Sequence, residues 1–318
     1  HTNIRVTNDE ARTSLTSWLR SLDQPSMDGW NVYTVCQTVR QHDIRVALSG
    51  QGGDELFGGY SSFVDVPRAF AIHGRMGLLP RGARGALASL GRSLSSSGRV
   101  GKAADMLASD GSLVSLYLNR RRTLSDEQMK HLGVTASSVN LNPQFAPPEV
   151  LAELPLSEHD HVANISKLES TFYLGNMLLR DSDTNGMAHS LELRVPMLDT
   201  ALLNLAFAIP GSVRLPNRRA DKHLLRVAFG ELLSESQLQG PKRGFHLPVG
   251  RWMAGPLKEF CEASLAELPG SLGLSAAGVR RIWNTFLRDP NSVMWSRAWE
   301  LCVLGSYLGT SSAAAAAA

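Results

Sequence analysis

Twelve consecutive residues, Ser49–Tyr60, carry the strongest chemical signal in this sequence, Ser-Gly-Gln-Gly-Gly-Asp-Glu-Leu-Phe-Gly-Gly-Tyr. They directly follow the apolar run Ile44–Leu48, which predicts a strand that feeds a glycine-rich loop. Gly50, Gly52 and Gly53 allow positive φ angles and bring backbone N–H groups close to a ligand. Because ligands of open α/β sheets bind where strands end, this loop is a candidate anion site.

The acidic pair Asp54 and Glu55 follows the glycines and places carboxylates where a metal-bound anion would lie. Two other glycine motifs do not fit this loop. No Lys-Ser or Lys-Thr follows, as a Walker loop requires, and the third glycine of the dinucleotide-binding fingerprint is missing. Taken alone, Gly-Gly-Asp-Glu would equally describe a tight turn with a solvated acidic pair.

A second candidate site lies around Lys222, at the start of a segment with helical periodicity. The apolar spacing after Lys222 predicts one buried stripe, formed by Leu225, Ala228, Phe229 and Leu232. With Arg218 and Arg219 just upstream, three cations gather at a helix end that already carries partial positive charge. An anion would relieve this conflict; the alternative is that Lys222 extends past the stripe to water.

Glu192 and Arg194 lie in the short stretch between Met187 and Pro196, which is too apolar for a free surface loop. Because buried charges are normally paired, we expect a structural ion pair that holds the helices against the sheet. We therefore treat both residues, together with Asp199, as scaffold rather than as part of the site.

The composition is that of a globular enzyme, with 318 residues, 43% hydrophobic residues and a net charge of +3. The 32 basic and 29 acidic residues are interspersed, so no nucleic-acid-binding surface is indicated. The longest apolar stretch, Val195 to Ile209, is interrupted by polar residues and is too short to span a membrane. The three cysteines, Cys36, Cys261 and Cys302, indicate neither disulfides nor a metal site, and we expect a cytoplasmic protein.

The elements that must position these residues begin with a short α/β part. Residues 3–6 and 44–48 are the two predicted strands, and helical segments near 8–22 and 29–42 separate them. The motif loop therefore follows the second predicted strand.

Beyond residue 60 the pattern predicts helix upon helix. Residues 80–113 read as a helix with breaks or as an exposed hairpin, and prolines predict a loop over 140–155. A long helix is expected over 158–180. Four tryptophans should pack the last helices, namely Trp252, Trp283, Trp295 and Trp299.

The twelve-residue motif resembles the S-G-x-G-G-D-E-L-F-G-G-Y segment of the asparagine synthetase family, in the ATP-dependent synthetase domain of the glutamine-hydrolysing enzymes. Further blocks resemble family segments in the same order along the chain: Asp23–Gly29, Asp183–Asp199, and Lys222–Arg226 followed by Pro241–Phe245. The order of these blocks makes the resemblance specific.

The resemblance implies an α/β fold that is mostly helical, with a partial parallel sheet of the adenine-nucleotide α-hydrolase-like (PP-loop ATPase) type. We expect a truncated nucleotide-binding part over residues 1–60, a helical part over 61–312 and an uninformative alanine tail over 313–318. The implied activity is ATP-dependent synthesis of asparagine from aspartate through an aspartyl-AMP intermediate, with Mg²⁺ and with ammonia from glutamine.

The resemblance also carries family roles onto residues of this sequence. Lys222 would stabilise phosphate charge during adenylation and amide formation. Ser49 and Gly50 would border ATP and the acyl-adenylate. Asp54 would help to hold Mg²⁺, and Glu55 would either contribute to the same ion or brace the loop.

Gln51 is a further candidate catalytic residue and a departure from the family pattern. Family members with an acidic residue at this position can use it around the reacting acyl group, whereas a neutral amide can form hydrogen bonds but cannot act as a base. The block at 183–187 departs as well, because Thr184 and Gly186 replace the family's Arg and Ser. Both changes leave the identity of the acyl substrate open.

Two features of the family are not found in this sequence, namely the S-G-G-x-D-S pyrophosphate loop upstream of Ser49 and the catalytic cysteine of a glutaminase domain. Half of the phosphate site would then be missing, and two strands without neighbours would leave backbone groups unpaired. We therefore expect the isolated chain to be inactive. The alternatives are another amide-forming homologue, either β-lactam synthetase-like or peptide- or polysaccharide-modifying, and a non-catalytic fragment. A homodimer is compatible with each of these interpretations.

Overall fold

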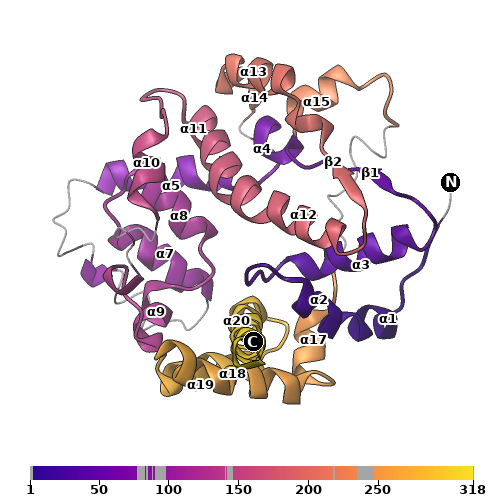
Figure 1. The fold of residues 1–318 in the computed structure, drawn as a ribbon. Coiled ribbons are helices and arrows are strands. Elements are labelled where there is room, and N and C mark those ends of the chain that lie inside the picture. The colour runs from indigo at the N-terminus through magenta and orange to yellow at the C-terminus, as the bar shows by residue number, and fades with distance from the viewer. Residues whose placement is uncertain are drawn as a thin grey trace.

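Helices make up most of the computed structural model of this chain (Figure 1). The structure describes residues 3–76, 83, 85–87, 89, 98–139, 141, 146–217, 219–234 and 246–317. In this part of the chain, none of the helices combines the length and the hydropathy of a membrane-spanning segment.

The N-terminal segment forms the α/β part, with α1 (Asn8–Thr13), α2 (Leu15–Ser21), α3 (Gly29–Arg40), β1 (Val46–Leu48) and α4 (Gly53–Phe57). The helices predicted near 8–22 and 29–42 and the strand predicted near 44–48 are confirmed. The strand predicted over 3–6 is wrong, because within the described residues this segment pairs with no strand. It leads into a capping box, in which the Thr7 hydroxyl accepts the Glu10 N–H and the Glu10 carboxylate accepts the Thr7 N–H.

The sheet consists of β1 and a second strand, β2 (Glu192–Arg194), which the sequence pattern did not predict. The two strands run parallel, with Val46 opposite Glu192 and Leu48 opposite Arg194. Ser49 continues this ladder, since its N–H donates to the Arg194 carbonyl over 2.8 Å. The long connection between the two strands contains the central helix described below, as parallel pairing requires a crossover.

Glu192 and Arg194 form the expected ion pair, with Arg194 Nε 2.8 Å from Glu192 Oε1, but the prediction that the pair is buried is wrong. The Arg194 and Glu192 side chains are 62% and 56% exposed. Because side chains alternate along a strand, both project from the same face of the sheet as Val46 and Leu48. That face is open, with Leu48 itself 74% exposed, so the pair does not hold helices against the sheet.

One long helix crosses the centre of the fold (Figure 1) and comprises α11 (His161–Leu168), the π-helical segment η2 (Glu169–Leu179) and α12 (Arg180–Met187). The helix predicted over 158–180 is therefore confirmed and continues further. α12 packs against α3, and the buried Asp181 accepts a hydrogen bond from Ser26 over 2.8 Å. After α12 the Leu191 N–H donates to the Gly186 carbonyl, and the chain turns directly into β2.

Helices α5 (Ser62–Met76), α7 (Gly98–Ala108) and α8 (Leu113–Arg121) form a second core with this central helix. On the same side lie α9 (Asp126–Leu132) and α10 (Pro148–Glu153), with η1 (Ser137–Val139) between them in the chain, and α9 contributes Met129 and Leu132 to the largest core. The helical prediction for 80–113 holds for α7, whereas most of 77–97 lies outside the described residues. The loop predicted over 140–155 is wrong in part, because α10 lies within it. Pro148 occupies the first helical position, where proline is favoured.

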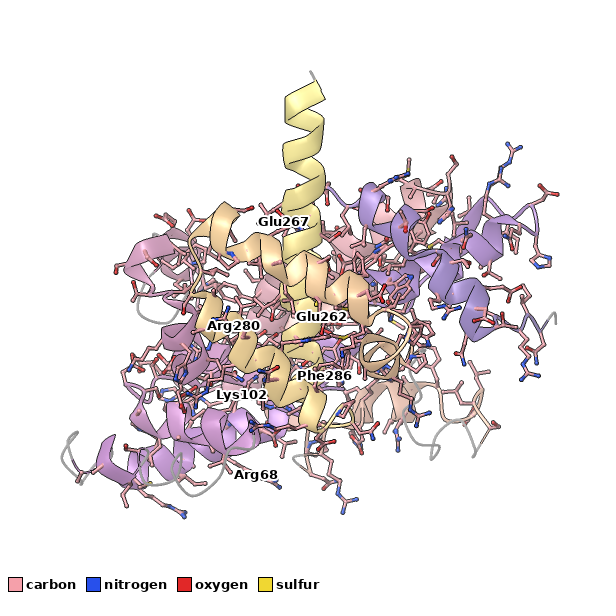
Figure 2. The ribbon with its side chains drawn as sticks, turned by 90° about the horizontal axis from the view of Figure 1, so that it is seen from below. Arg68, Lys102, Glu262, Glu267, Arg280 and Phe286 are labelled. Carbon is pink, nitrogen blue, oxygen red and sulfur yellow. The ribbon has the colours of Figure 1, made fainter. Side chains whose placement is uncertain are left out.

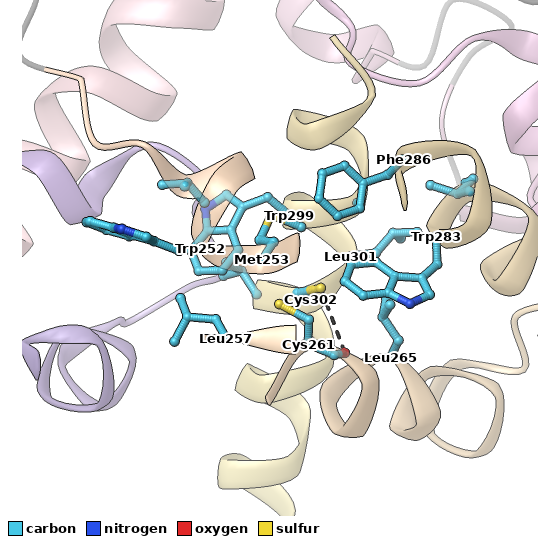
Figure 3. Close-up of a cluster of buried hydrophobic side chains, with 14 of the residues drawn as sticks. Trp252, Met253, Leu257, Cys261, Leu265, Trp283, Phe286, Trp299, Leu301 and Cys302 are labelled. Carbon is cyan, nitrogen blue, oxygen red and sulfur yellow. Dashed lines mark hydrogen bonds between the residues drawn. The ribbon is translucent and has the colours of Figure 1, made fainter. Parts of the chain in front are cut away.

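The last helices enclose the largest hydrophobic core (Figure 3): α17 (Val249–Ala254), α18 (Lys258–Leu272), α19 (Ala276–Arg288) and α20 (Met294–Ala317). Trp252, Trp283 and Trp299 are buried in it and Trp295 packs against it, as predicted. Cys36, Cys261 and Cys302 are buried free thiols. The C-terminal end of α20 extends beyond the neighbouring helices (Figure 2), and the alanines at 313–317 continue it as helix.

Four short elements surround α4: η3 (Pro196–Leu198), α13 (Thr200–Ala208), α14 (Gly211–Arg214) and α15 (His223–Ala228). Asp199 has the predicted scaffold role, because its carboxylate accepts the backbone N–H groups of Ala201 and Leu202 at the start of α13. Together these elements bring the C-terminal half of the chain against the motif.

We predict that Asp181→Asn stabilises the protein at neutral pH. Burial raises the Asp181 pKa from 3.8 to about 6, so its contribution to stability is present below about pH 4 and is lost as the pH rises through about 6. Asparagine cannot ionise, so above about pH 6 the free energy of unfolding of the variant should exceed that of the parent by up to about 3 kcal/mol. Urea unfolding at several pH values measures the difference. Glu192→Gln, at an exposed carboxylate paired with Arg194, is the control, and equal pH profiles of parent and Asp181→Asn would contradict the prediction.

Candidate active site

The motif Ser49–Tyr60 forms a tight turn from the end of β1 into α4. Gly52 has a φ of +89° and precedes α4. A Cβ at Gly52 would lie 2.5 Å from Leu198 Cδ2, so both the backbone and the available space require glycine. Around Gly50, by contrast, the described residues other than its chain neighbours place no atom within 4 Å of where a Cβ would lie. The loop is therefore packed at Gly52 and open at Gly50.

The structure brings together Asp54 and Lys222, two of the residues predicted for the site, with Lys222 Nζ 3.0 Å from Asp54 Oδ2. The Asp54 side chain is 17% exposed and that of Lys222 is 34% exposed. A side chain at Gly59 would overlap the Asp54 carboxylate and would lie 2.7 Å from Lys222 Cε, so this glycine leaves room for the pair. The sequence predicts an anion beside Lys222, and the Asp54 carboxylate lies there.

The environment of Lys222 differs from the predicted one in two respects. Lys222 lies just before α15 in the left-handed region, with a φ of +55°, rather than within the first turn. The predicted buried stripe is wrong, because Phe229 and Leu232 are 44% and 79% exposed. α15 ends at Ala228, so later positions do not continue its buried face, and Leu224 and Leu225 pack against α4 instead. Arg218 and residues 241–245 lie outside the described residues.

Gln51 attaches the loop to the central helix. Its Nε2 donates to the Leu178 carbonyl over 3.2 Å and to Ser182 Oγ over 2.7 Å. Because a carbonyl can only accept, the amide nitrogen must face Leu178. The Gln51 Oε1 is buried and has no hydrogen-bond partner among the described residues. The amide therefore has one fixed orientation, which leaves one acceptor for a donor group. The Gln51 N–H in turn donates to Ser49 Oγ over 3.4 Å, within the loop itself.

Glu55 lies beneath the loop rather than on its surface. It is 1% exposed, and its Oε1 accepts a hydrogen bond from the Tyr60 hydroxyl over 2.7 Å. Burial raises the pKa of Glu55, and burial together with the nearby Glu55 carboxylate raises that of Tyr60. The two ends of the motif are thus tied to each other inside the protein.

A buried ion pair that the sequence analysis did not identify supports this arrangement. Glu169, with no solvent exposure, accepts two hydrogen bonds from the Arg121 guanidinium and further ones from Ser62 and Tyr117. The guanidinium also lies over aromatic rings, 3.8 Å from the Tyr173 centroid and 4.6 Å from that of Tyr60. These residues lie far apart in the sequence, so no short sequence pattern links them.

The C-terminal end of α4 is anchored by two further residues that the sequence did not indicate. The Ser166 hydroxyl donates to the Glu55 carbonyl over 2.6 Å. Arg214 has no solvent exposure, and its Nη1 donates to the Leu56 carbonyl over 3.0 Å and to Ser166 Oγ over 3.2 Å. A cation at the C-terminal end of a helix complements its dipole. These contacts hold α4, and with it Asp54, in one orientation.

The predicted metal ligands differ in how well they fit Mg²⁺. The described residues contain no group of three or more His, Cys, Asp or Glu side chains arranged to hold a metal. Mg²⁺ commonly takes one or two carboxylates and completes its ligands with water and substrate phosphates. Asp54 is partly exposed beside the open loop, whereas the Glu55 carboxylate is buried against Tyr60. Asp54 therefore fits such a shared site and Glu55 does not fit it in this arrangement.

A comparison with known protein families decides the relationship of this chain. The family described as asparagine synthase matches residues 1–307. The chain belongs to the asparagine synthase family. The resemblance that the ordered blocks indicate is thereby confirmed, and the motif loop with Asp54 and Lys222 is the chain's candidate asparagine synthase site.

Individual relatives from bacteria and mammals agree with the family. The chain is 29% identical over 305 residues to a putative asparagine synthetase (glutamine-hydrolyzing) of Mycobacterium tuberculosis, covering 94% of this chain and 44% of the relative. The chain is also 29% identical over 242 residues to asparagine synthetase (glutamine-hydrolyzing) 1 of Bacillus subtilis, which covers 74% of this chain and 36% of that relative. It is 38% identical over 81 residues to the asparagine synthetase (glutamine-hydrolyzing) of Mus musculus, which covers 25% of this chain and 14% of that relative. The chain therefore spans less than half the length of these relatives.

We predict that Glu169→Gln destabilises the protein by about 3 kcal/mol or more, because breaking a buried ion pair leaves the Arg121 charge without its partner. Urea or thermal unfolding measures this loss. Glu192→Gln is a matched control, because it breaks an exposed Glu–Arg pair and should not change stability measurably. Equal stabilities of the two variants would show that the buried pair is not what supports the loop.

Proposed function

We propose that this chain is the synthetase part of an enzyme that makes asparagine from aspartate, ATP and ammonia, with glutamine as the ammonia source in the complete protein. The observation that carries the proposal is the Asp54–Lys222 pair beside an open glycine loop at the end of a parallel strand. A carboxylate and an ammonium group at such a loop suit a metal-bound phosphate. We take β1 and β2 as strands of a nucleotide-binding sheet of the PP-loop type.

The reaction we assign has two steps. An oxygen of the aspartate side chain attacks the α-phosphorus of ATP, and pyrophosphate leaves to give aspartyl-AMP. Ammonia then attacks the acyl carbon, AMP leaves, and a proton is released from the nitrogen. Both steps demand positioning and the stabilisation of charge on phosphate oxygens.

We assign these two tasks, positioning and charge stabilisation, to residues of this chain as follows. Ser49 and the open Gly50 border the nucleotide and the acyl-adenylate. The Lys222 ammonium stabilises negative charge on phosphate. Asp54 would hold Mg²⁺ together with the phosphates, and the metal would neutralise part of their charge. The buried contacts of Glu55, Ser166 and Arg214 keep this loop fixed, so little reorganisation is needed during the reaction.

A second candidate function is the synthesis of a different amide by the same chemistry, and the departures from the family pattern at Gln51, Thr184 and Gly186 favour it. The Gln51 amide nitrogen is used by Leu178 and Ser182, so the free Oε1 can accept only a donor group of the ligand. The α-ammonium group of aspartate can supply this donor, and so can a donor group of another acyl substrate. Identification of the product formed from ATP, ammonia and a panel of carboxylates separates the two candidates.

We predict that Lys222→Ala lowers aspartate-dependent AMP release by about a hundredfold, because the loss of one transition-state donor typically costs about 3 kcal/mol. The assay uses the complete polypeptide that carries this chain, and circular dichroism checks its folding. Lys258→Ala is the matched control, since Lys258 forms an exposed pair with Glu262 on α18. Turnover of Lys222→Ala at the parental rate would contradict the proposed site.

We predict that Gln51→Glu lowers the same activity about tenfold or more. A carboxylate oxygen would face the Leu178 carbonyl at about the 3.2 Å of the present contact, and an acceptor would replace the donor there. Gln51→Met, which removes the hydrogen bonds without adding charge, separates the two effects in steady-state kinetics. Activity of Gln51→Glu equal to or above that of the parent would show that an acidic residue is tolerated and that the contact with the central helix does not matter.

A further inference from the structure

A cavity of about 510 Å³ lies between the segment before α3, the start of α17 and the start of α20. Its volume is within the range of small-molecule sites. No residue of the motif Ser49–Tyr60 lines it, and neither does Lys222. The cavity is therefore separate from the candidate asparagine synthase site, and its ligand has to be inferred from its own walls.

One wall carries the carboxylate of Asp28, at the position just before α3. Asp28 makes no side-chain hydrogen bond to the first turn of α3, and among the described residues the charged group that acts on its carboxylate is His246. Burial raises the pKa of Asp28, and His246 on another part of the wall is a nearby basic group. A half-buried carboxylate that does not cap its helix favours a ligand that brings a cationic donor.

Arg251 and His246 also line the cavity, and both are exposed to solvent. A ligand that carried only a positive charge would be attracted by Asp28 and repelled by Arg251. A ligand with both an ammonium group and a carboxylate satisfies Asp28 and Arg251 together, because a guanidinium binds carboxylates through two parallel hydrogen bonds.

Three tryptophans form an apolar part of the wall, which also contains the polar residues Asn31 and Asn291. Trp30, Trp295 and Trp299 line the cavity, and the first and last of these are packed in the core with 2% and 1% exposure. Trp295 is half-buried and offers its surface to the cavity. A Cβ at Gly250 would lie 3.0 Å from Trp295 Cβ, so α17 packs closely behind this indole. Such a wall suits an apolar or aromatic group.

We propose that this cavity binds a free α-amino acid with an apolar side chain. Its ammonium group pairs with Asp28, its carboxylate pairs with Arg251, and its side chain packs on Trp295. This inference does not depend on the proposed function, since no residue of the motif takes part.

The test measures binding to the 318-residue chain by ligand-observed NMR and calorimetry. The three probes are L-phenylalanine, phenethylamine, which lacks the carboxylate, and hydrocinnamate, which lacks the amine. L-phenylalanine should bind saturably and more tightly than either analogue. Hydrocinnamate binding as tightly as L-phenylalanine, or no saturable binding of any probe, would overturn the proposal.

Variants then locate the ligand. Asp28→Asn should weaken L-phenylalanine and phenethylamine by about tenfold or more, because a charge-assisted hydrogen bond is lost. Arg251→Met, at an exposed position where folding is not at risk, should weaken L-phenylalanine and leave phenethylamine unchanged or tighter. Asp23→Asn, outside the cavity, is the control and should bind all probes as the parent does. Parental affinities in both Asp28→Asn and Arg251→Met would place the ligand elsewhere and overturn the proposal.

Discussion

The burial of one carboxylate organises the surroundings of the motif. Glu169 has no solvent exposure, and an unpaired charge in that position would cost several kcal/mol. Arg121 of α8, Ser62 of α5 and Tyr117 of α8 must therefore lie around it. The same guanidinium packs on Tyr60, the last residue of the motif. Satisfying a single charge thus fixes the central helix, two neighbouring helices and one end of the loop relative to each other.

The loop itself is held from two directions. From the interior, Ser166 and Arg214 bind the carbonyls of Glu55 and Leu56, and Tyr60 binds the Glu55 carboxylate. On the exposed side, Lys222 pairs with Asp54. The residues with buried roles stabilise the geometry, whereas the Asp54–Lys222 pair is partly exposed to solvent. The loop therefore combines fixed buried contacts with one solvent-accessible charge pair.

The small sheet is held by backbone hydrogen bonds more than by burial of its faces. Parallel sheets are normally covered on both faces, yet Val46 and Leu48 are 42% and 74% exposed here. The pairing of β1 with β2 is nevertheless continued by Ser49, so backbone hydrogen bonds keep the start of the motif in register. In the described part of the chain, the position of the loop therefore depends more on this ladder and on α4 than on burial of the sheet.

The sequence by itself determined the elements and residue types that depend on local order. The glycines and carboxylates of the motif, the first helices, the strand before the loop and the tryptophans of the last helices follow from short patterns. The tertiary structure alone decided which of these residues meet. The strand β2 is too short and polar to be recognised without its partner, and Glu192 and Arg194 are exposed because their face of the sheet is open. The Glu169–Arg121 pair and the contact of Gln51 with Ser182 join segments that are distant in the chain. Such contacts depend on how helices pack, and no periodicity within one segment encodes them.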